Sequence, residues 1–61
     1  MTPRELEVLR MAAEGTPTRE IADRLALSVG TVRNHLAAVA SKVGARNRVD
    51  TIRIVRESGW L

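Results

Sequence analysis

The sequence predicts an all-α domain of four helices, and three observations indicate this fold class. Helix-capping residues precede four apolar segments, and a glycine follows three of these segments. Within each segment the apolar residues recur every three or four positions, which is the period of a helix buried on one face. No segment alternates polar and apolar residues between turn signals, as a half-buried strand would. Because the chain has 61 residues, we expect a single domain with a small aliphatic core.

The first predicted helix covers residues 3–14. Thr2 is expected to be its N-cap, Pro3 its first helical residue, and Glu5 the partner of Thr2 in a capping box. Gly15 supplies the left-handed position that ends a helix. The apolar face is expected to contain Leu6, Leu9 and Ala13.

The second predicted helix covers residues 19–25 and is expected to be capped by Thr18. Its apolar face consists of Ile21, Ala22 and Leu25. Residues 26–28 then interrupt the helical pattern, and Leu27 within this break is expected to turn inward.

The third predicted helix covers residues 29–43. Ser28 is expected to cap it by accepting a hydrogen bond from the Thr31 amide, and Gly44 is expected to end it. One apolar stripe runs along this helix at spacings of four, three and four, formed by Val32, Leu36, Val39 and Val43.

The fourth predicted helix covers residues 48–58. Asn47 is its expected N-cap, and Gly59 follows its last turn. Ile52 and Val55 are expected to face the core. We find no internal repeat and no linker, so residues 1–61 are interpreted as one domain.

The composition excludes several classes of protein. The chain has no cysteine and one histidine, so neither a disulfide framework nor a zinc ribbon is expected. No pair of titratable groups is predicted to converge in a cleft, and we expect neither an enzyme nor a cofactor or metal site. No apolar run has the length of a membrane span, and no segment has the pattern of a signal peptide. These features predict a cytoplasmic protein with no membrane contact.

The distribution of charge is more informative than its sum. The net charge is only +3, but no acidic residue occurs between Asp23 and Asp50. The basic residues within that interval are Arg24, Arg33, Lys42, Arg46 and Arg48. One continuous basic stretch in an otherwise balanced chain is typical of a protein that contacts phosphate.

The outer face of the third predicted helix has an unusual composition. Opposite its apolar stripe lie Gly30, Asn34, Ala37 and Ser41, with Arg33 on the flank, where long charged residues would be typical. Small side chains allow a helix to approach the major groove of DNA closely. The fork of Arg33 matches guanine O6 and N7, and Asn34 can pair with adenine N6 and N7. The alternative is a solvated helix face that contains small residues.

The lengths of the second and third helices support the interpretation that the third helix enters the major groove of DNA. A helix of seven residues, a three-residue break and a longer helix have the spacing of a helix-turn-helix motif. Thr18 and Arg19 stand at the amino end of the first of these helices, where free amides suit a phosphate. Further residues that could hold the DNA backbone, or could equally be solvated surface groups, are Ser28, Thr31, Lys42, Arg46 and Arg48.

The motifs together resemble a known family. The chain is similar along essentially its whole length to the LuxR-type helix-turn-helix domain, and most similar to the effector domains of NarL/FixJ-type response regulators. Many matched positions at fixed spacing make this resemblance more specific than a single motif. The residues that carry it include Thr2-Pro3-Arg4-Glu5, Glu20-Ile21-Ala22, Thr31-Val32, His35-Leu36, Lys42-Val43-Gly44 and the ending Arg56-Glu57-Ser58-Gly59-Trp60-Leu61.

The resemblance implies a tetrahelical domain of a bacterial transcription regulator that binds double-stranded DNA sequence-specifically. In the family the third helix reads the major groove, with base contacts at positions that match Arg33, Asn34 and Ala37. Ala37 departs from relatives that have a long basic residue there. Family members commonly form homodimers through the fourth helix, and the residues that project outward there are Asp50, Arg53, Ile54 and Glu57.

The resemblance also implies further partners. Such domains follow a phosphoacceptor receiver or a small-molecule sensor, and relatives usually have leucine at the position of Met1. We therefore expect an effector domain separated from a longer regulator, with RNA polymerase as a further candidate partner. Two other hypotheses are a helical adaptor that docks a partner helix and a sigma-factor-like domain that polymerase brings to a promoter.

Overall fold

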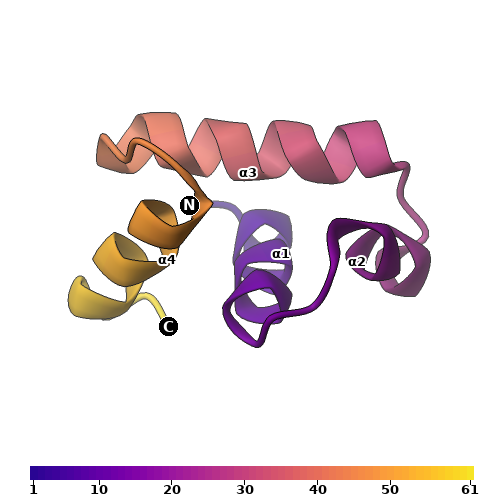
Figure 1. Cartoon of the computed structure of the whole chain (residues 1–61), viewed down its shortest axis with the longest axis horizontal. Helices are drawn as coiled ribbons and strands as arrows, with labels where there is room; N and C mark the ends of the chain where they lie inside the picture. Colours follow the sequence, from indigo (N-terminus) through magenta and orange to yellow (C-terminus); the bar gives the residue numbers. More distant parts are fainter.

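The computed structural model describes residues 1–61 as four helices without a strand. They are α1 (Pro3–Ala13), α2 (Thr18–Leu25), α3 (Val29–Val43) and α4 (Arg48–Glu57). The long helix α3 forms one edge of the molecule, and the other three helices lie along the same side of it with α1 in the middle (Figure 1). This architecture confirms the all-α prediction.

Three of the predicted caps are present. In the capping box of α1, Thr2 Oγ1 accepts a hydrogen bond from the Glu5 amide at 3.2 Å, and Glu5 Oε1 accepts one from the Thr2 amide at 3.0 Å. The other two caps each accept a hydrogen bond from the amide three residues further on: Ser28 from Thr31 at 3.0 Å, and Asn47 from Asp50 at 2.9 Å.

The prediction that Thr18 caps α2 is wrong. Thr18 is itself the first helical residue, Pro17 occupies the N-cap position, and no side chain caps the helix. The Thr18 hydroxyl instead accepts a hydrogen bond from Arg48. Helices α1 and α4 each end one residue earlier than predicted, because the backbone tightens into a turn at Glu14 and Ser58.

The break between α2 and α3 depends on a left-handed residue that the sequence reading missed. Ala26 adopts φ 56° and ψ 42°, a region that glycine occupies at much lower cost. The Leu27 amide then donates to the Ala22 carbonyl at 2.8 Å, which closes a Schellman-type end of α2. Leu27 packs against the core, as predicted.

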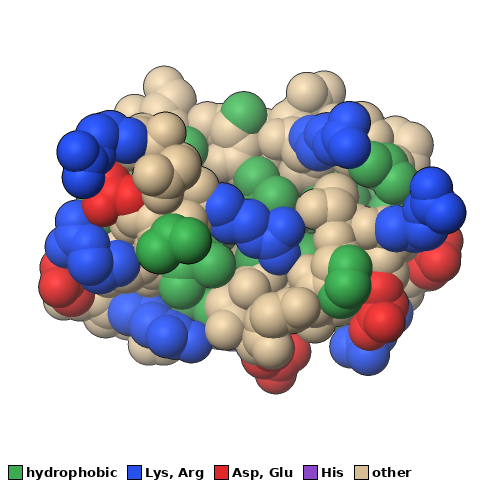
Figure 2. Space-filling view, in the orientation of Figure 1, with side chains coloured by type: hydrophobic (Ala, Val, Ile, Leu, Met, Phe, Trp, Pro, Cys, Tyr) green, Lys and Arg blue, Asp and Glu red, His purple; other side chains and the backbone are tan.

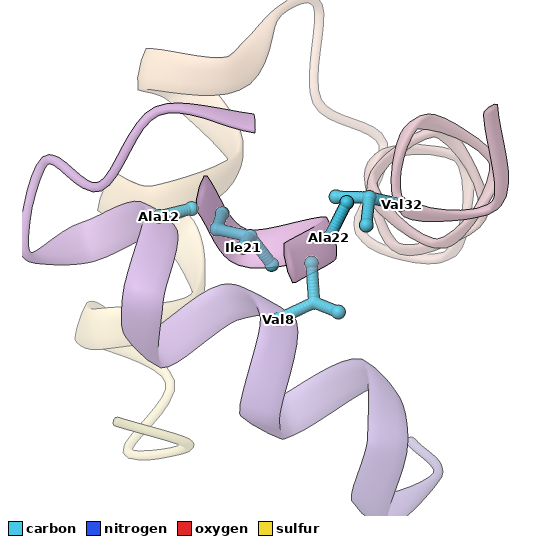
Figure 3. Close-up of a cluster of buried hydrophobic side chains, with 5 residues drawn as sticks. All are labelled: Val8, Ala12, Ile21, Ala22 and Val32. Carbon is cyan, nitrogen blue, oxygen red and sulfur yellow. The ribbon is translucent and has the colours of Figure 1, made fainter. Parts of the chain in front are cut away.

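The core consists of two neighbouring clusters of buried side chains. In the first, residues from α1, α2 and α3 converge, namely Val8, Ala12, Ile21, Ala22 and Val32 (Figure 3). The second joins α1, α3 and α4 through Leu9, Val39 and Val55. The half-buried residues Leu25, Leu36, Val43 and Ile52 pack against these clusters, which confirms the predicted core positions of α2, α3 and α4.

The predicted face of α1 is partly wrong. Val8, Leu9 and Ala12 are its buried apolar residues, whereas Leu6 and Ala13 are only half-buried. The reason is tertiary, because α1 contacts all three other helices and therefore buries a wider face than a one-sided helix does. No helix is both long and apolar enough to span a lipid bilayer.

Candidate nucleic-acid interface

The candidate interface begins with the orientation of α3. Val32 and Val39 are fully buried and anchor the helix to the core. The opposite face is therefore turned to solvent, and its exposed residues are Gly30, Arg33, Asn34, Ala37, Ala38 and Ser41. The predicted outward face is thus the observed one.

Arg33 and Asn34 have no polar partner within the chain. Neither side chain takes part in a hydrogen bond, and Arg33 forms no ion pair. Their donors and acceptors are therefore available to a ligand. An arginine fork and an amide that both donates and accepts are the side chains that best match guanine and adenine in the major groove.

Gly30 is not required by the fold. Its φ is not positive, and a Cβ atom built there would meet only Ser28 Oγ at 3.9 Å, an ordinary van der Waals distance. A glycine inside a helix destabilises it by about 0.5–1 kcal/mol relative to alanine. This cost is not offset by any contact within the chain, so the bare backbone at the start of α3 suits close approach by another molecule.

The electrostatic pattern singles out the same region. No acidic residue occurs between Asp23 and Asp50, and no acidic side chain is visible along the upper rim of Figure 2, where α3 lies. Most basic side chains are nevertheless engaged with other parts of the chain; Arg24, for example, pairs with Glu20 at 2.6 Å. The three arginines without an ion pair or hydrogen bond are Arg10, Arg19 and Arg33.

The amino end of α2 carries one of these free arginines. Arg19 is exposed next to Thr18, and no side chain caps the first turn of the helix. The positive end of the helix dipole and the unengaged amides of this turn attract an anion. The predicted phosphate-binding pair therefore lies at an accessible helix terminus, although the Thr18 hydroxyl already accepts a hydrogen bond at 3.1 Å from Arg48.

The half-exposed Lys42 side chain is engaged with Glu5 on α1. Its Nζ donates to Glu5 Oε1 at 2.8 Å and to Oε2 at 3.0 Å. The Glu5 residue is only 5% exposed. The hydrogen bond from Lys42, followed by that from the Thr2 amide, lowers the pKa of Glu5 to about 2. The charge of Lys42 is thus matched within the chain, a pairing that no local sequence pattern predicted.

The remaining predicted backbone residues differ in their accessibility. The hydroxyls of Ser28 and Thr31 lie 2.9 Å apart and hydrogen bond to each other. The Arg46 side chain is 86% exposed, with Nε 3.9 Å from Asp50 Oδ2. Arg48 is half-buried, and its guanidinium donates to the Thr16 carbonyl, just before α2, and to the hydroxyl of Thr18, the first residue of α2.

The outward face of α4 combines a charge ladder with an exposed apolar residue. Arg53 donates to Asp50 at 2.7 Å and to Glu57 at 2.8 Å. The hydrogen bond from Arg53, then that from the Arg46 amide, lowers the pKa of Asp50, and the reciprocal contacts raise the pKa of Arg53.

The exposed apolar residue of α4 is Val49, which the sequence reading missed. Val49 is 78% exposed, whereas Ile54, predicted to project outward, is half-buried. Val49 lies beside Ile52, Arg53, Arg56 and Glu57 around a shallow depression. The helical spacing of residues 49, 53 and 56 was the signal that could have identified it.

A short helix and a longer one, joined by a three-residue break, define a helix-turn-helix domain, and the longer helix presents unpartnered polar side chains to solvent. Residues 1–55 match the family described as "Bacterial regulatory proteins, luxR family". The chain belongs to this family, which confirms the resemblance stated from its motifs.

The relatives are named as regulators. The chain is 62% identical over 60 residues to the response regulator RamR of Streptomyces coelicolor, covering 98% of this chain and 30% of that protein. It is 42% identical over 60 residues to the transcriptional regulatory protein DesR of Bacillus subtilis, with the same two coverages. It is also 41% identical over 61 residues to the transcriptional activator protein ExaE of Pseudomonas putida, covering 100% of this chain and 28% of that protein.

Family membership settles the broad class of function. The domain belongs to DNA-binding transcription regulators and is not an enzyme, as the sequence predicted. The chain spans about 30% of the length of these three relatives.

Proposed function

We propose that this domain binds specific sites in double-stranded DNA by placing the first half of α3 in the major groove. Arg33 and Asn34 read base edges there, while Gly30 and Ala37 allow the backbone of α3 to come close. The observation that carries this proposal is that Arg33 and Asn34 are exposed and unpartnered within an otherwise small-residue face. The amino-terminal residues of a recognition helix are the ones that contact bases in this class of motif.

The phosphate contacts follow from accessibility. Arg19 is free and exposed, and Arg46 is almost fully exposed, so these two residues are the best-supported contacts with the DNA backbone. The free backbone amides at the amino end of α2, next to Thr18, are a third candidate contact with the DNA backbone. Backbone contacts from Ser28, Thr31, Lys42 and Arg48 stay predictions, because the polar groups of each are engaged within the chain.

The test uses a matched pair of free arginines. A binding site is first selected from random DNA, and affinity is then measured for that site and for a scrambled duplex by fluorescence anisotropy. Arg33→Ala should weaken binding to the selected site by about 10–100-fold and reduce the preference over scrambled DNA. Arg10→Ala is the control, because Arg10 is equally unpaired but lies on α1 in a depression formed with Arg56 and Leu61.

Three outcomes would contradict the proposal. An equal loss on both duplexes with Arg33→Ala would remove the base-reading role of Arg33. Absence of wild-type binding to random DNA at low salt below ~100 μM would favour a protein-docking adaptor, since non-specific binding is typically 10⁻⁴–10⁻⁶ M. Binding that needs RNA polymerase would favour the sigma-factor-like alternative.

We further propose that two copies associate through α4 on DNA. The exposed Val49, which lines the same depression as the half-buried Ile52 and the oppositely charged Arg53 and Glu57, supports a self-complementary contact. Contacts from Asp50, whose side chain is only 12% exposed, and from the half-buried Ile54 stay predictions. Half-sites would then be centred about 10 bp apart. Val49→Glu should abolish cooperative binding to a two-half-site duplex, as measured by sedimentation and anisotropy, while affinity for a single half-site stays unchanged.

We also infer that the domain works in the cytoplasm as the output part of a longer regulator, next to a receiver or sensor domain and in contact with RNA polymerase. Support comes from the names of its relatives, one of which is a response regulator. Transcription from a promoter that carries the selected site, measured in vitro with the full-length regulator, tests this inference. Equal transcription with and without the regulator would contradict it.

A further inference from the structure

Arg48 connects two parts of the molecule that are distant in the chain. It is the first residue of α4, and its guanidinium reaches Thr16, between α1 and α2, and Thr18, the first residue of α2. Nη1 donates to Thr18 Oγ1 at 3.1 Å, and Nη2 donates to the Thr16 carbonyl at 2.9 Å. The two acceptors lie 30 and 32 residues away in sequence.

Arg48 holds residues on both sides of the start of α2. Thr16 is 8% exposed, and its amide donates to the Met11 carbonyl at 3.0 Å, so it is fixed to the end of α1. Thr18 opens α2, which lacks a side-chain cap of its own. The bond from Arg48 is the hydrogen bond that ties the Thr18 side chain to the rest of the fold.

The geometry of arginine suits this role. The planar guanidinium presents its N–H groups in a rigid fork, so two acceptors bound at once fix both distance and orientation. A lysine keeps the charge but offers a point donor on a flexible stem. Arg48 is itself fixed, because it starts a helix whose N-cap, Asn47, is satisfied at 2.9 Å.

We propose that Arg48 is a positioning residue for DNA binding: it holds the amino end of α2 so that Thr18 and Arg19 meet a phosphate. The inference rests on the proposed function and deepens it, because it gives the engaged Arg48 an indirect role. The Arg48 side chain also connects α4 to the amino end of α2.

The test is a double-mutant cycle of Arg48→Gln and Arg19→Gln, with affinity for the selected duplex measured against salt concentration. Arg48→Gln alone should weaken binding about tenfold. In the Arg19→Gln background it should change affinity by less than about threefold and leave the salt dependence unchanged. Arg48→Lys should resemble Arg48→Gln, because charge alone does not hold both acceptors.

Arg56→Gln is the matched control. Arg56 also lies on α4 and donates to a distant backbone carbonyl, that of Ala13 at 3.2 Å, but this contact is at the end of α1 and not at α2. Because Arg56 also lines the depression beside Val49, this control is measured on a duplex with a single half-site, where its loss should leave DNA affinity unchanged. Circular dichroism at the assay temperature confirms that each variant is folded, and amide NMR shifts of Thr18 and Arg19 should move in Arg48→Gln and stay constant in Arg56→Gln.

Three outcomes would overturn the inference. Additive losses in the cycle, with a further fall in salt dependence of about one ion, would make Arg48 a direct phosphate contact. Wild-type affinity in a folded Arg48→Gln variant would leave it a purely structural residue. Wild-type DNA affinity in Arg48→Lys would show that only the positive charge at residue 48 matters. If the wild type does not bind DNA, the proposed function itself fails, which is a separate result.

Discussion

Lys42 and Glu5 lie 37 residues apart in sequence, yet the Lys42 ammonium holds both carboxylate oxygens of Glu5 at 2.8 and 3.0 Å. This ion pair joins the end of α3 to the start of α1. The same carboxylate accepts the Thr2 amide in the capping box. One side chain therefore completes a helix cap and fixes the orientation of α3 relative to α1.

Lys42→Met should destabilise the domain by about 1–2 kcal/mol, because a nearly buried carboxylate loses its charged partner. Chemical denaturation gives the free energy of unfolding. Arg24→Met is the control, since Arg24 forms an exposed pair with Glu20 one turn away, and such pairs contribute about 0.3–0.5 kcal/mol. Equal effects of the two substitutions would contradict a structural role for the Lys42 pair.

The pair also predicts how stability depends on pH. The pKa of Glu5 in the folded protein is about 2, below its ordinary value of 4.5. Its contribution is therefore complete above the ordinary value and is lost as the pH falls toward 2. Between pH 5 and pH 2, the free energy of unfolding should fall less steeply in Glu5→Gln, which keeps an acceptor for the cap, than in the wild type. Some slope should persist, because the pKa of Asp50 is also lowered.

Ala26→Gly should stabilise the domain by about 0.5–1 kcal/mol. Ala26 has φ 56°, where the alanine Cβ is strained and glycine is not. Thermal denaturation compares this variant with Ala38→Gly, which puts glycine into the exposed face of α3 and should destabilise by about 1 kcal/mol. Opposite signs are expected, and destabilisation by both substitutions would show that the left-handed turn carries no strain.

Gly30→Ala should raise the stability of the domain and lower its affinity for DNA. A Cβ at this position meets no close contact, so the variant should be more stable by about 0.5–1 kcal/mol. Its DNA affinity should fall, because the added methyl group holds α3 away from the groove. Gly44→Ala is the contrasting variant, since φ 71° makes it destabilising. Unchanged DNA affinity in Gly30→Ala would contradict close approach at this residue.

Much of the fold was predictable because it depends on local rules. Capping residues such as Thr2, Ser28 and Asn47 accept hydrogen bonds from amides three residues away, so their effect depends only on a short stretch of sequence. The apolar stripe on α3 was also predictable from a local pattern, and its burial necessarily turned Arg33 and Asn34 outward. The class of protein followed from that face and from the motifs around it.

The sequence by itself determined four helices, the outward face of α3 and membership of a DNA-binding family. Only the tertiary structure decided what the other charged residues do, because a charge acquires its partner from whichever helix packs beside it. It matched Lys42 to Glu5, directed Arg48 to Thr16 and Thr18, and left Arg19 free. It also exposed Val49 in place of Ile54, since the packing of α4 against α1 and α3 sets which side of that helix is covered.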